Sequence, residues 1–352
     1  MRPAVRAILG IVVVAGALTG AGCASAVLAP KIVTAPNTTG GARPGFAVDH
    51  PEARVALAQL YARTLRVPVP GPPAAEIAIG VIEPGDYRHE YDLAVQSVDP
   101  SKPRYAVTTR WEPLPAGAPP LEPKGTIVLL HGFWLSREAV LHWAIHLAQA
   151  GYRTVPVDLR GHGASTGPWV TFGALETGDL AAVVSELQRQ GLAEKRVGVL
   201  GISYGAALGL LWAAHDERIG PVVALEPYSD PRIAIRQYAR AMLSPAISRS
   251  LSDRTISSAT TRAARLAGFD WGQVDVVGAV SRLRTPILLI HGAADTVIPP
   301  DHSRRLRDVA PAGSRLIETP GDDHFSLSMR LKGISAEVVS WFDQALAVPA
   351  TP

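Results

Sequence analysis

The most reactive arrangement in this chain is a serine between two glycines. Residues 197–205 read Val-Gly-Val-Leu-Gly-Ile-Ser-Tyr-Gly, a hydrophobic run that ends in G-x-S-x-G. A sharp turn from a strand into a helix brings two backbones so close that glycine is needed two residues before and after the serine. Gly201 and Gly205 meet this need. The pattern predicts that Ser203 is a nucleophile exposed at the positive end of a helix, with an ordinary strand-to-helix turn as the alternative.

Two later segments supply the partners that a reactive serine requires. A serine hydroxyl is a poor nucleophile at neutral pH, so it needs a histidine base and a carboxylate that fixes the tautomer of that histidine. Residues 286–292 form an apolar run of strand length followed by Asp295, and residues 314–319 form a short strand followed by His324. The sequence therefore predicts a triad of Ser203, His324 and Asp295.

Other side chains compete for the acid and base positions. The rival acids follow an earlier strand or stand beside the predicted base: Glu226, Asp230, Asp322 and Asp323. The rival histidines are His291 and His302. We expect Asp295 and His324 because each lies in a loop after a late strand, although a turn aspartate and a solvated histidine would also fit.

Acyl transfer also needs N–H groups that point at the developing oxyanion. Residues 126–134 form a hydrophobic strand that ends in His-Gly-Phe-Trp, the position expected for a donor loop. We expect the backbone N–H groups of Phe133 and Tyr204 to be the donors, with His131 bracing the loop and Gly132 allowing close approach of the backbone. A plain glycine turn is the alternative.

Together these motifs resemble the alpha/beta-hydrolase superfamily of serine hydrolases, over residues of about 85–348. The chain is most similar to its lysophospholipase, monoacylglycerol lipase and serine-aminopeptidase-like branch, in which an Asp-x-Arg-Gly-His-Gly-x-Ser loop is usual. The resemblance implies an α/β architecture, the alpha/beta-hydrolase fold, with a mostly parallel central sheet, helices on both faces and a helical lid insertion. The matching segments are 131–133, 158–165, 201–205, 291–295 and His324.

The loop at 158–165 is expected to be structural. Its glycines turn the chain at the end of a strand, and Asp158 and Arg160 are expected to pair across it, so His162 is not expected to act in catalysis. Two differences from other classes of this superfamily disfavour the reactions of those classes. Ser203 stands where dehalogenase-like and epoxide-hydrolase-like members use aspartate, and the chain lacks the His-Gly-Gly-Gly run of the hormone-sensitive-lipase type.

The hydrophobic pattern predicts alternating strands and helices, and the strands are continuously apolar, as in a parallel sheet covered on both faces. Two earlier strands, near 89–98 and 104–112, alternate in polarity and are expected to form an antiparallel edge. Reactive groups then gather at the carboxyl ends of the strands. The later strands are predicted at 126–131, 154–159, 197–201, 222–227, 286–291 and 314–319, and the helices at 136–150, 174–190, 204–215, 301–310 and 334–347.

The chain between the strands at 222–227 and 286–291 is too long for a bare connection and predicts a lid over 228–280. An arginine recurs there every fourth residue, at positions 232, 236 and 240, on one face of a helix. Such a row is typical of a solvated surface, but it would also suit an anionic substrate or lipid headgroups. Trp134, which adds bulk beside the donor loop, and Tyr228 are expected to contact the substrate.

The N-terminus reads as a leader that is separate from the domain. Two arginines precede an apolar run over 7–18, which is followed by small residues and by Cys23, the only cysteine in the chain. This pattern predicts a signal peptide over 1–26 and export to the cell envelope, with Cys23 as a lipid anchor in the membrane. Cleavage at 24–26 and simple secretion are the alternative.

The rest of the chain is expected to form one domain behind a linker. Residues 27–48, rich in Pro, Gly and Thr, predict a flexible tether, and 49–348 the alpha/beta-hydrolase domain. Residues 51–66 have apolar positions at helical spacing, and that helix is expected to dock on the domain or to cover the site entrance. With 352 residues, 47% of them hydrophobic, the chain can bury the core of one large domain.

Several function classes are disfavoured. The net charge is only +3 and the basic residues are not interleaved with aromatic ones, so no nucleic-acid partner is expected. His142 and His146 share a predicted helix without a third ligand, so no metal site is expected. The chain has no glycine-rich phosphate loop, so no cofactor is expected either.

The sequence thus predicts a serine hydrolase that cleaves carboxylic esters through an acyl-serine intermediate. Its substrate would be a small-molecule or lipid ester, such as an acyl ester, a lysophospholipid or a monoacylglycerol. A serine peptidase or amidase with the same triad stays open as an alternative. A non-catalytic binding lipoprotein of the envelope that kept the fold is the other.

Overall fold

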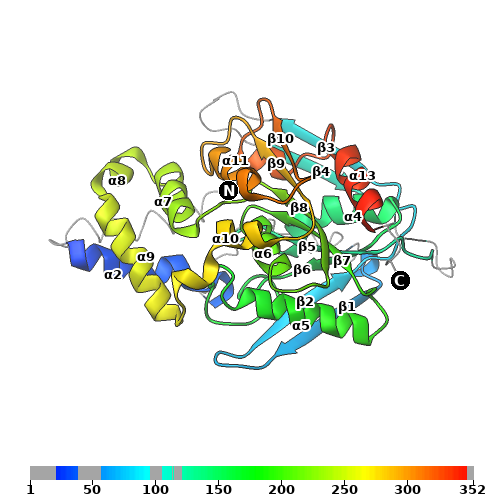
Figure 1. Cartoon of the computed structure of the whole chain (residues 1–352), viewed down its shortest axis with the longest axis horizontal. Coiled ribbons are helices and arrows are strands. Elements are labelled where there is room, and N and C mark those ends of the chain that lie inside the picture. Colours follow the sequence, from blue (N-terminus) through cyan, green and yellow to red (C-terminus); the bar gives the residue numbers. More distant parts are fainter. Residues whose placement is uncertain (1–20, 39–56, 96–104, 113, 115–120, 347–352) are drawn as a thin grey trace.

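The computed structural model of the chain describes residues 21–38, 57–95, 105–112, 114 and 121–346. Its centre is an eight-stranded sheet in the order β1-β2-β6-β5-β7-β8-β9-β10 (Figure 1). Strands β5 to β10 run parallel, and β1 and β2 add an antiparallel edge. The strands are β1 (Arg63–Val69), β2 (Ala75–Val81), β5 (Thr126–Leu130), β6 (Arg153–Val157), β7 (Val197–Ile202), β8 (Ile219–Leu225), β9 (Ile287–Gly292) and β10 (Arg315–Thr319).

The central strands are apolar throughout because both of their faces are buried. In β5 the side chains of Val128 and Leu130 join the hydrophobic cluster on one face of the sheet, and those of Ile127 and Leu129 join the cluster on the other. Successive side chains of a strand point to opposite faces, so a strand covered on both sides needs an unbroken hydrophobic run. The carboxyl ends of these strands therefore lie together at one edge of a rigid support.

Helices cover both faces of the sheet (Figure 1). One face carries α5 (Glu176–Arg189), α6 (Tyr204–Ala213), α10 (Val276–Arg282) and α11 (Asp301–Val309). The other carries α4 (Leu141–Gln149), which follows the 3-10 turn η2 (Arg137–Val140), with α12 (His324–Ser328) and α13 (Ser335–Leu346). The strands and helices predicted from residue 126 onward outside the lid are confirmed, with small shifts at their ends.

The antiparallel edge was predicted wrongly. Among the described residues, strands β3 (Glu90–Val95) and β4 (Tyr105–Arg110) pair with each other alone, as a separate two-stranded sheet, and β1 and β2 form the antiparallel edge of the main sheet. Strand β1 begins inside the helix predicted over 51–66, of which residues 57–60 are helical and 51–56 lie outside the described residues. An edge strand buries few side chains, and in β1 only Val67 is fully buried. The helix prediction extended too far, because from Leu65 to Val69 buried or half-buried apolar residues alternate with exposed ones, as in a strand.

The lid segment is helical, as predicted. Helices α7, α8 and α9 form a lobe beside the sheet, and η3 and α10 lead the chain back to it (Figure 1). The elements are α7 (Pro231–Met242), α8 (Pro245–Ser250), α9 (Asp253–Ala267) and η3 (Trp271–Val274).

Of the tether predicted over 27–48, residues 27–33 belong to a docked helix and not to a flexible linker, which corrects that part of the prediction. Helix α2 (Ala21–Val33) lies along α9 of the lid, and the side chains of Ala29 and Val33 are buried there (Figure 1). The backbone N–H of Ala35 then donates to the carbonyl oxygen of Pro168, 3.0 Å away. Small apolar residues allow close helix packing, which outweighs the linker-like composition. Residues 39–48 lie outside the described part.

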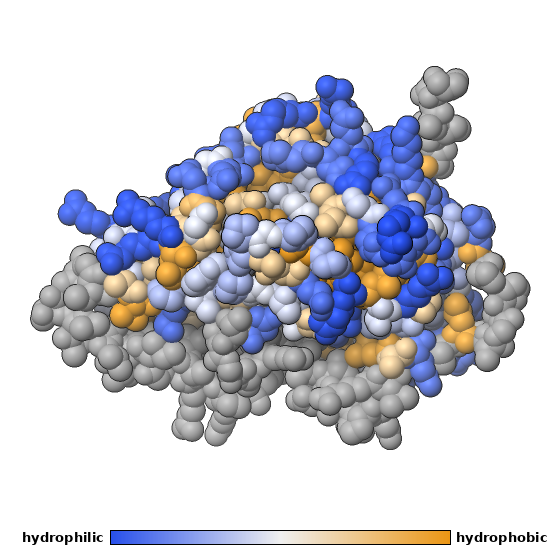
Figure 2. All heavy atoms as spheres, turned by 90° about the horizontal axis from the view of Figure 1, so that it is seen from below, coloured by the Kyte–Doolittle hydropathy of each residue, from blue (hydrophilic) through white to orange (hydrophobic). Residues whose placement is uncertain are grey.

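Among the described residues, none of the helices has the length and apolar content needed to cross a bilayer. Figure 2 shows one face of the molecule, on which hydrophobic side chains form separate patches among hydrophilic ones. The large hydrophobic side chains that are exposed in the described part are Leu121, Tyr238, Met242, Leu266 and Phe325.

Candidate active site

Ser203 stands on the sharp turn between β7 and α6. Its φ angle is +51°, a left-handed conformation that is strained for a residue with a side chain. A Cβ atom on Gly205 would lie 2.4 Å from the carbonyl oxygen of Leu130, and one on Gly201 would lie 2.3 Å from that of Gly205. Only glycine fits at either position, so the turn has the form that the G-x-S-x-G pattern predicts.

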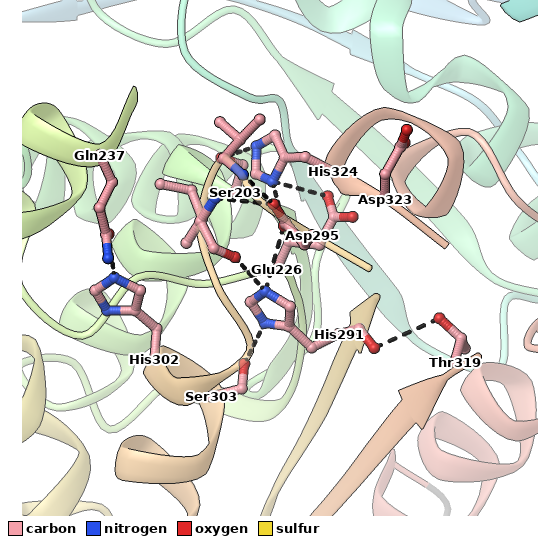
Figure 3. A network of polar contacts seen from close by, with 12 residues as sticks. Ser203, Glu226, Gln237, His291, Asp295, His302, Ser303, Thr319, Asp323 and His324 are labelled. Atoms are coloured by element: carbon pink, nitrogen blue, oxygen red, sulfur yellow. Dashed lines mark hydrogen bonds and ion pairs between the residues drawn. The ribbon is translucent and has the colours of Figure 1, made fainter. Parts of the chain in front are cut away.

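His324 links Ser203 to Asp295 (Figure 3). The Oγ of Ser203 lies 3.1 Å from Nε2 of His324, and Nδ1 of His324 lies 2.7 Å from Oδ2 of Asp295. A carboxylate accepts hydrogen bonds only, so Nδ1 carries the proton and Nε2 is left to accept from the serine hydroxyl. Three predicted residues that are distant in sequence are thus connected by two hydrogen bonds.

The loop after β9 fixes Asp295 as an anion. Its Oδ1 accepts the backbone N–H groups of Val297 and Ile298, each at 2.8 Å. Burial alone would raise the pKa of Asp295, but the hydrogen bonds from His291 and His324 hold it well below its usual range. The carboxylate therefore stays ionised while it orients the imidazole.

Neither rival histidine reaches Ser203. His291 lies behind Asp295, with Nε2 2.7 Å from the carbonyl oxygen of Ile298 and 3.3 Å from Oδ2 of Asp295. His302 is held between Ser229 and Gln237, with Nε2 2.7 Å from Oε1 of Gln237.

Three of the four rival acids have other partners. Asp230 caps the start of α7, Asp323 caps the start of α12, and Asp322 pairs with Arg330 at 2.7 Å. Asp230 and Asp323 follow the local rule that a short acidic side chain satisfies the free N–H groups at the start of a helix.

The fourth rival, Glu226, lies against the predicted triad. Its Oε2 is 3.8 Å from Nδ1 of His324, and neither of its oxygens has a hydrogen-bond partner among the described residues. Complete burial, and then the neighbouring charge of Asp295, raise the pKa of Glu226 well above its usual value, so it is held as a neutral acid. Glu226, Asp295 and His324 form the one group of three side chains in the described part of the chain whose possible metal-ligating atoms all lie within 4.8 Å of one another.

The two predicted N–H donors stand next to the nucleophile. Tyr204 is the first residue of α6, so its N–H has no acceptor within the helix. The N–H of Phe133, in the loop after β5, has no hydrogen-bond partner among the described residues either. The rings of Phe133 and Tyr204 are 5.8 Å apart, and the start of α6 touches the end of β5.

Two buried histidines hold the donor loop in place by accepting backbone hydrogen bonds. The N–H of Trp134 donates to Nε2 of His162 at 3.3 Å, and the N–H of Leu159 donates to Nε2 of His131 at 3.1 Å. Burial lowers the pKa of His131 to about 4 and that of His162 to about 3, so both rings stay neutral and can accept these bonds. His131 thus has the bracing position expected from the sequence, and His162 has a structural position in the same region.

The pairing predicted inside the loop at 158–165 is wrong. Arg160 does not bond Asp158 but makes two hydrogen bonds to Asp179 of α5, at 2.7 and 2.5 Å. Asp158 instead accepts the N–H groups of Arg137 and Ala164, at 2.8 and 3.0 Å. The guanidinium reaches a more distant helix because its long side chain can cross the loop, whereas the short aspartate serves neighbouring backbone.

The two expected substrate contacts differ in position. Tyr228 is only 4% exposed and packs in the hydrophobic core, and its hydroxyl group has no hydrogen-bond partner among the described residues. Trp134 is half-buried, and its ring lies 5.9 Å from that of Phe133, beside the donor loop. Trp134 is therefore the more exposed of the two and lies beside the donor loop.

A cavity of about 750 Å³ opens beside His324. Helix α7 forms one wall, and the loop after β9 and the start of α12 form the other. Thr296, Val297 and Phe325 also line this cavity. Sequence reasoning missed them, because side chains of these types carry no chemical signature. The arginine row of the lid was the one available signal, since Arg236 and Arg240 line the same cavity.

The histidine pair that was weighed as a metal site has packing roles. His142 is buried, with Nε2 3.1 Å from the carbonyl oxygen of Ser328 and its ring stacked on that of Tyr91. His146 lies edge-on to the ring of Trp143.

Comparison with known proteins identifies the fold. A family model described as the alpha/beta hydrolase fold matches residues 125–244. The esterase Pf2001 of Pyrococcus furiosus superimposes with a TM-score of 0.55 at 19% identity, over 82% of this chain and 95% of that one. The proline iminopeptidase of Mycobacterium smegmatis does so with a TM-score of 0.52 at 15% identity, over 80% and 98%.

The curated relative YqkD of Bacillus subtilis, an uncharacterized protein, is 27% identical over 191 residues. That match spans 53% of this chain and only 60% of the length of YqkD. The family model and the structural likenesses establish that the chain has an alpha/beta-hydrolase fold. The predicted fold class, a mostly parallel sheet with helices on both faces and a helical lid, is confirmed.

Proposed function

We propose that this protein is a serine hydrolase that cleaves carboxylic esters through an acyl-serine intermediate. One observation carries the proposal: Nε2 of His324 lies 3.1 Å from Oγ of Ser203 while its Nδ1 is bonded to Asp295 at 2.7 Å. A serine oriented in this way on a strained turn has the general base that it needs to act as a nucleophile.

In the first half of the reaction, His324 takes the proton of Ser203 as Oγ forms a bond to the acyl carbon. The carbonyl electron pair moves onto the oxygen, and the N–H groups of Phe133 and Tyr204 stabilise that oxyanion. The intermediate collapses, the bond to the alcohol oxygen breaks, and Nε2 of His324 returns its proton to the leaving alkoxide. Asp295 stabilises the imidazolium while the proton resides on it.

In the second half, water takes the place of the alcohol. His324 removes one proton from the water as its oxygen attacks the acyl-serine carbon, and a second tetrahedral intermediate forms. Its collapse breaks the bond to Oγ of Ser203, which regains the proton from Nε2. The products are a carboxylic acid and an alcohol, and the enzyme returns to its starting state.

The substrate side of the proposal rests on the cavity beside His324. Its volume of about 750 Å³ lies within the range of sites that hold small molecules and acyl chains. The structural relatives include a protein named as an esterase and one named as a peptidase, so an amide substrate is the second candidate. Turnover of an acyl ester and of an aminoacyl amide of matched size separates the two.

Replacing the nucleophile tests the proposal. We expect Ser203→Ala to lower turnover of a 4-nitrophenyl ester by roughly 10⁴-fold or more without loss of the fold. Ser185→Ala, on the outer surface of α5, is the matched control and should keep full turnover. Turnover by Ser203→Ala at the level of the control would overturn the proposal.

We also propose export to the cell envelope with a lipid on Cys23. The supporting features are the basic and apolar leader and the position of the single cysteine. Because Cys23 falls within α2, which packs along α9, such an anchor would hold the lid close to the membrane. Mass spectrometry of the mature N-terminus, in the native chain and in Cys23→Ser, should reveal a diacylglyceryl adduct only in the former. An unmodified thiol in the native chain would refute it.

A further inference from the structure

Three arginines recur along one face of the lid helix α7, and two of them are already paired. Arg232 makes an ion pair with Asp230 at 2.9 Å, and Arg240 makes one with Asp253 at 2.9 Å. Arg240 also donates to the carbonyl oxygen of Leu251 at 2.7 Å. These two guanidinium groups therefore serve the lid itself.

The middle arginine of the row differs from the others. Arg236 lines the cavity beside His324, is half-buried, and has no hydrogen bond or ion pair with any described residue. A guanidinium group carries five N–H donors and keeps its charge at any physiological pH. Arg236 thus offers an unused cationic donor set inside the cavity.

The two acidic side chains of the cavity already have hydrogen-bond partners of their own, although the hydrogen bond from Arg240, and to a lesser extent the charge of Arg236, lower the pKa of Asp253. Asp253 is bonded to Arg240, and Asp323 accepts the backbone N–H groups of Phe325 and Ser326, at 3.0 and 2.8 Å. The Oε1 of Gln237, also in the wall, is held by His302.

The rest of the cavity wall is partly apolar. Ala241, Met242, Val297 and Phe325 line it, and Met242 and Phe325 are 50% and 40% exposed. Exposed hydrophobic side chains of this size in a cavity gain free energy when a ligand covers them. One end of the cavity meets His324, the base that faces Ser203.

We propose that Arg236 selects ester substrates that carry an anionic group, a carboxylate or a phosphate, joined to the scissile ester by an apolar spacer. The inference rests on the proposed hydrolysis at Ser203 and specifies its substrate class. The anion bonds the guanidinium, the spacer lies on Met242 and Phe325, and the ester carbonyl reaches the serine. Charge-assisted bonds from arginine to an oxyanion are among the strongest that proteins make.

Paired substrates test this selection on the full-length protein. In one arm the anion is on the acyl side, with mono-4-nitrophenyl glutarate compared with 4-nitrophenyl valerate. In the other arm it is on the alcohol side, with a monoacyl glycerol phosphate compared with the corresponding monoacylglycerol. We expect kcat/KM to favour the anionic partner by about ten-fold or more in one of the arms, and that arm identifies the source of the anion.

Variants test whether Arg236 causes the preference for anionic substrates. Arg236→Gln should bring the ratio of anionic to neutral kcat/KM close to one, and Arg236→Lys should keep part of it. Arg262→Gln removes a lid arginine that lies on the exposed side of α9, away from the cavity, and should leave the ratio unchanged. Added salt should lower the ratio of the native protein, because it screens a partly exposed pair.

The outcomes separate this inference from the proposed function. If the native protein hydrolyses the neutral esters but shows no anionic preference in either arm, the role of Arg236 is refuted and the hydrolase proposal stands. If Arg236→Gln still prefers the anionic substrates, the role of Arg236 is likewise refuted and the hydrolase proposal stands. If no ester of either kind is hydrolysed, the proposed function itself fails.

Discussion

The carboxyl group of Glu226 lies 3.8 Å from Nδ1 of His324, the same nitrogen that Asp295 binds at 2.7 Å. Glu226 is completely buried, has a φ angle of +55° and finds no hydrogen-bond partner among the described residues. A strained, unsatisfied acid costs stability. Its position makes it a second carboxyl group that can orient the imidazole when Asp295 is lost.

We therefore expect Asp295→Asn to retain more activity than the removal of a lone orienting carboxylate would allow. The asparagine keeps an oxygen for the N–H groups of Val297 and Ile298 but no longer binds the imidazole as an anion. Loss of such a carboxylate typically lowers kcat by about 10⁴-fold. Here we expect a smaller loss, and residual activity that rises with pH as Glu226 ionises.

The double variant Asp295→Asn with Glu226→Gln provides the control. It should lose a further ten-fold or more in kcat/KM and should lose the rise with pH. Equal activity and equal pH profiles for the single and double variants would show that Glu226 does not act on His324.

Glu226 should also make stability depend on pH. Its pKa in the folded protein is raised well above the ordinary value of 4.5. The folded state therefore keeps a proton that the unfolded chain releases, and stability is lost as pH rises from 4.5 toward the folded pKa. The slope can reach about 1.4 kcal/mol per pH unit.

Glutamine cannot ionise, so the melting temperature of Glu226→Gln relative to the native protein should increase from pH 5 to pH 8. Thermal unfolding of both proteins across this range measures the difference. A difference that does not change with pH would mean that Glu226 titrates alike in the folded and unfolded chains.

Gly205 packs so closely at the turn that carries Ser203 that one added methyl group should lower the stability of the protein. Gly205→Ala would place Cβ 2.4 Å from the carbonyl oxygen of Leu130, so the helix must shift and the protein should lose about 3 kcal/mol of unfolding free energy. Gly178→Ala in α5, where a Cβ meets open space, should gain up to about 1 kcal/mol from helix propensity. Urea titrations compare the two, and equal stabilities would contradict the packing described here.

The docked position of α2 gives a fourth prediction. Val33 is fully buried at the end of α2, whereas Lys31 of the same helix is exposed. Val33→Asp should cost about 2 kcal/mol because it removes a buried side chain from the core, and Lys31→Asp should cost little. If both variants unfold at the same denaturant concentration, the helix is not docked in solution.

Much of the site could be predicted because its residues follow strands with an unmistakable pattern. The runs before Ser203 and Asp295 are almost entirely apolar, whereas the short strand before His324 also carries polar residues. Parallel strands bring the carboxyl ends of all three to one edge of the sheet. The residue types and their order along the chain then left few possible combinations of nucleophile, base and acid.

The errors come from contacts that sequence spacing does not encode. Arg160 and Asp179 belong to a loop and a helix whose relative position depends on the packing of the sheet. Glu226 was weighed only as a rival of Asp295, because a linear sequence cannot indicate that both carboxyl groups approach one nitrogen. Strand β1 was missed because the helical spacing assigned to 51–66 was carried past Arg63, although Leu65, Val67 and Val69 alternate with exposed residues as in a strand.

The central claim, that Ser203 is an activated nucleophile, is tested most directly by covalent labelling. A fluorophosphonate reacts with a serine only where a base takes up its proton, so the native protein should acquire one adduct per chain. Peptide mapping should place that adduct on Ser203, and Ser203→Ala should remain unlabelled. An unlabelled native protein, or an adduct on another residue with Ser203 unmodified, would contradict the account.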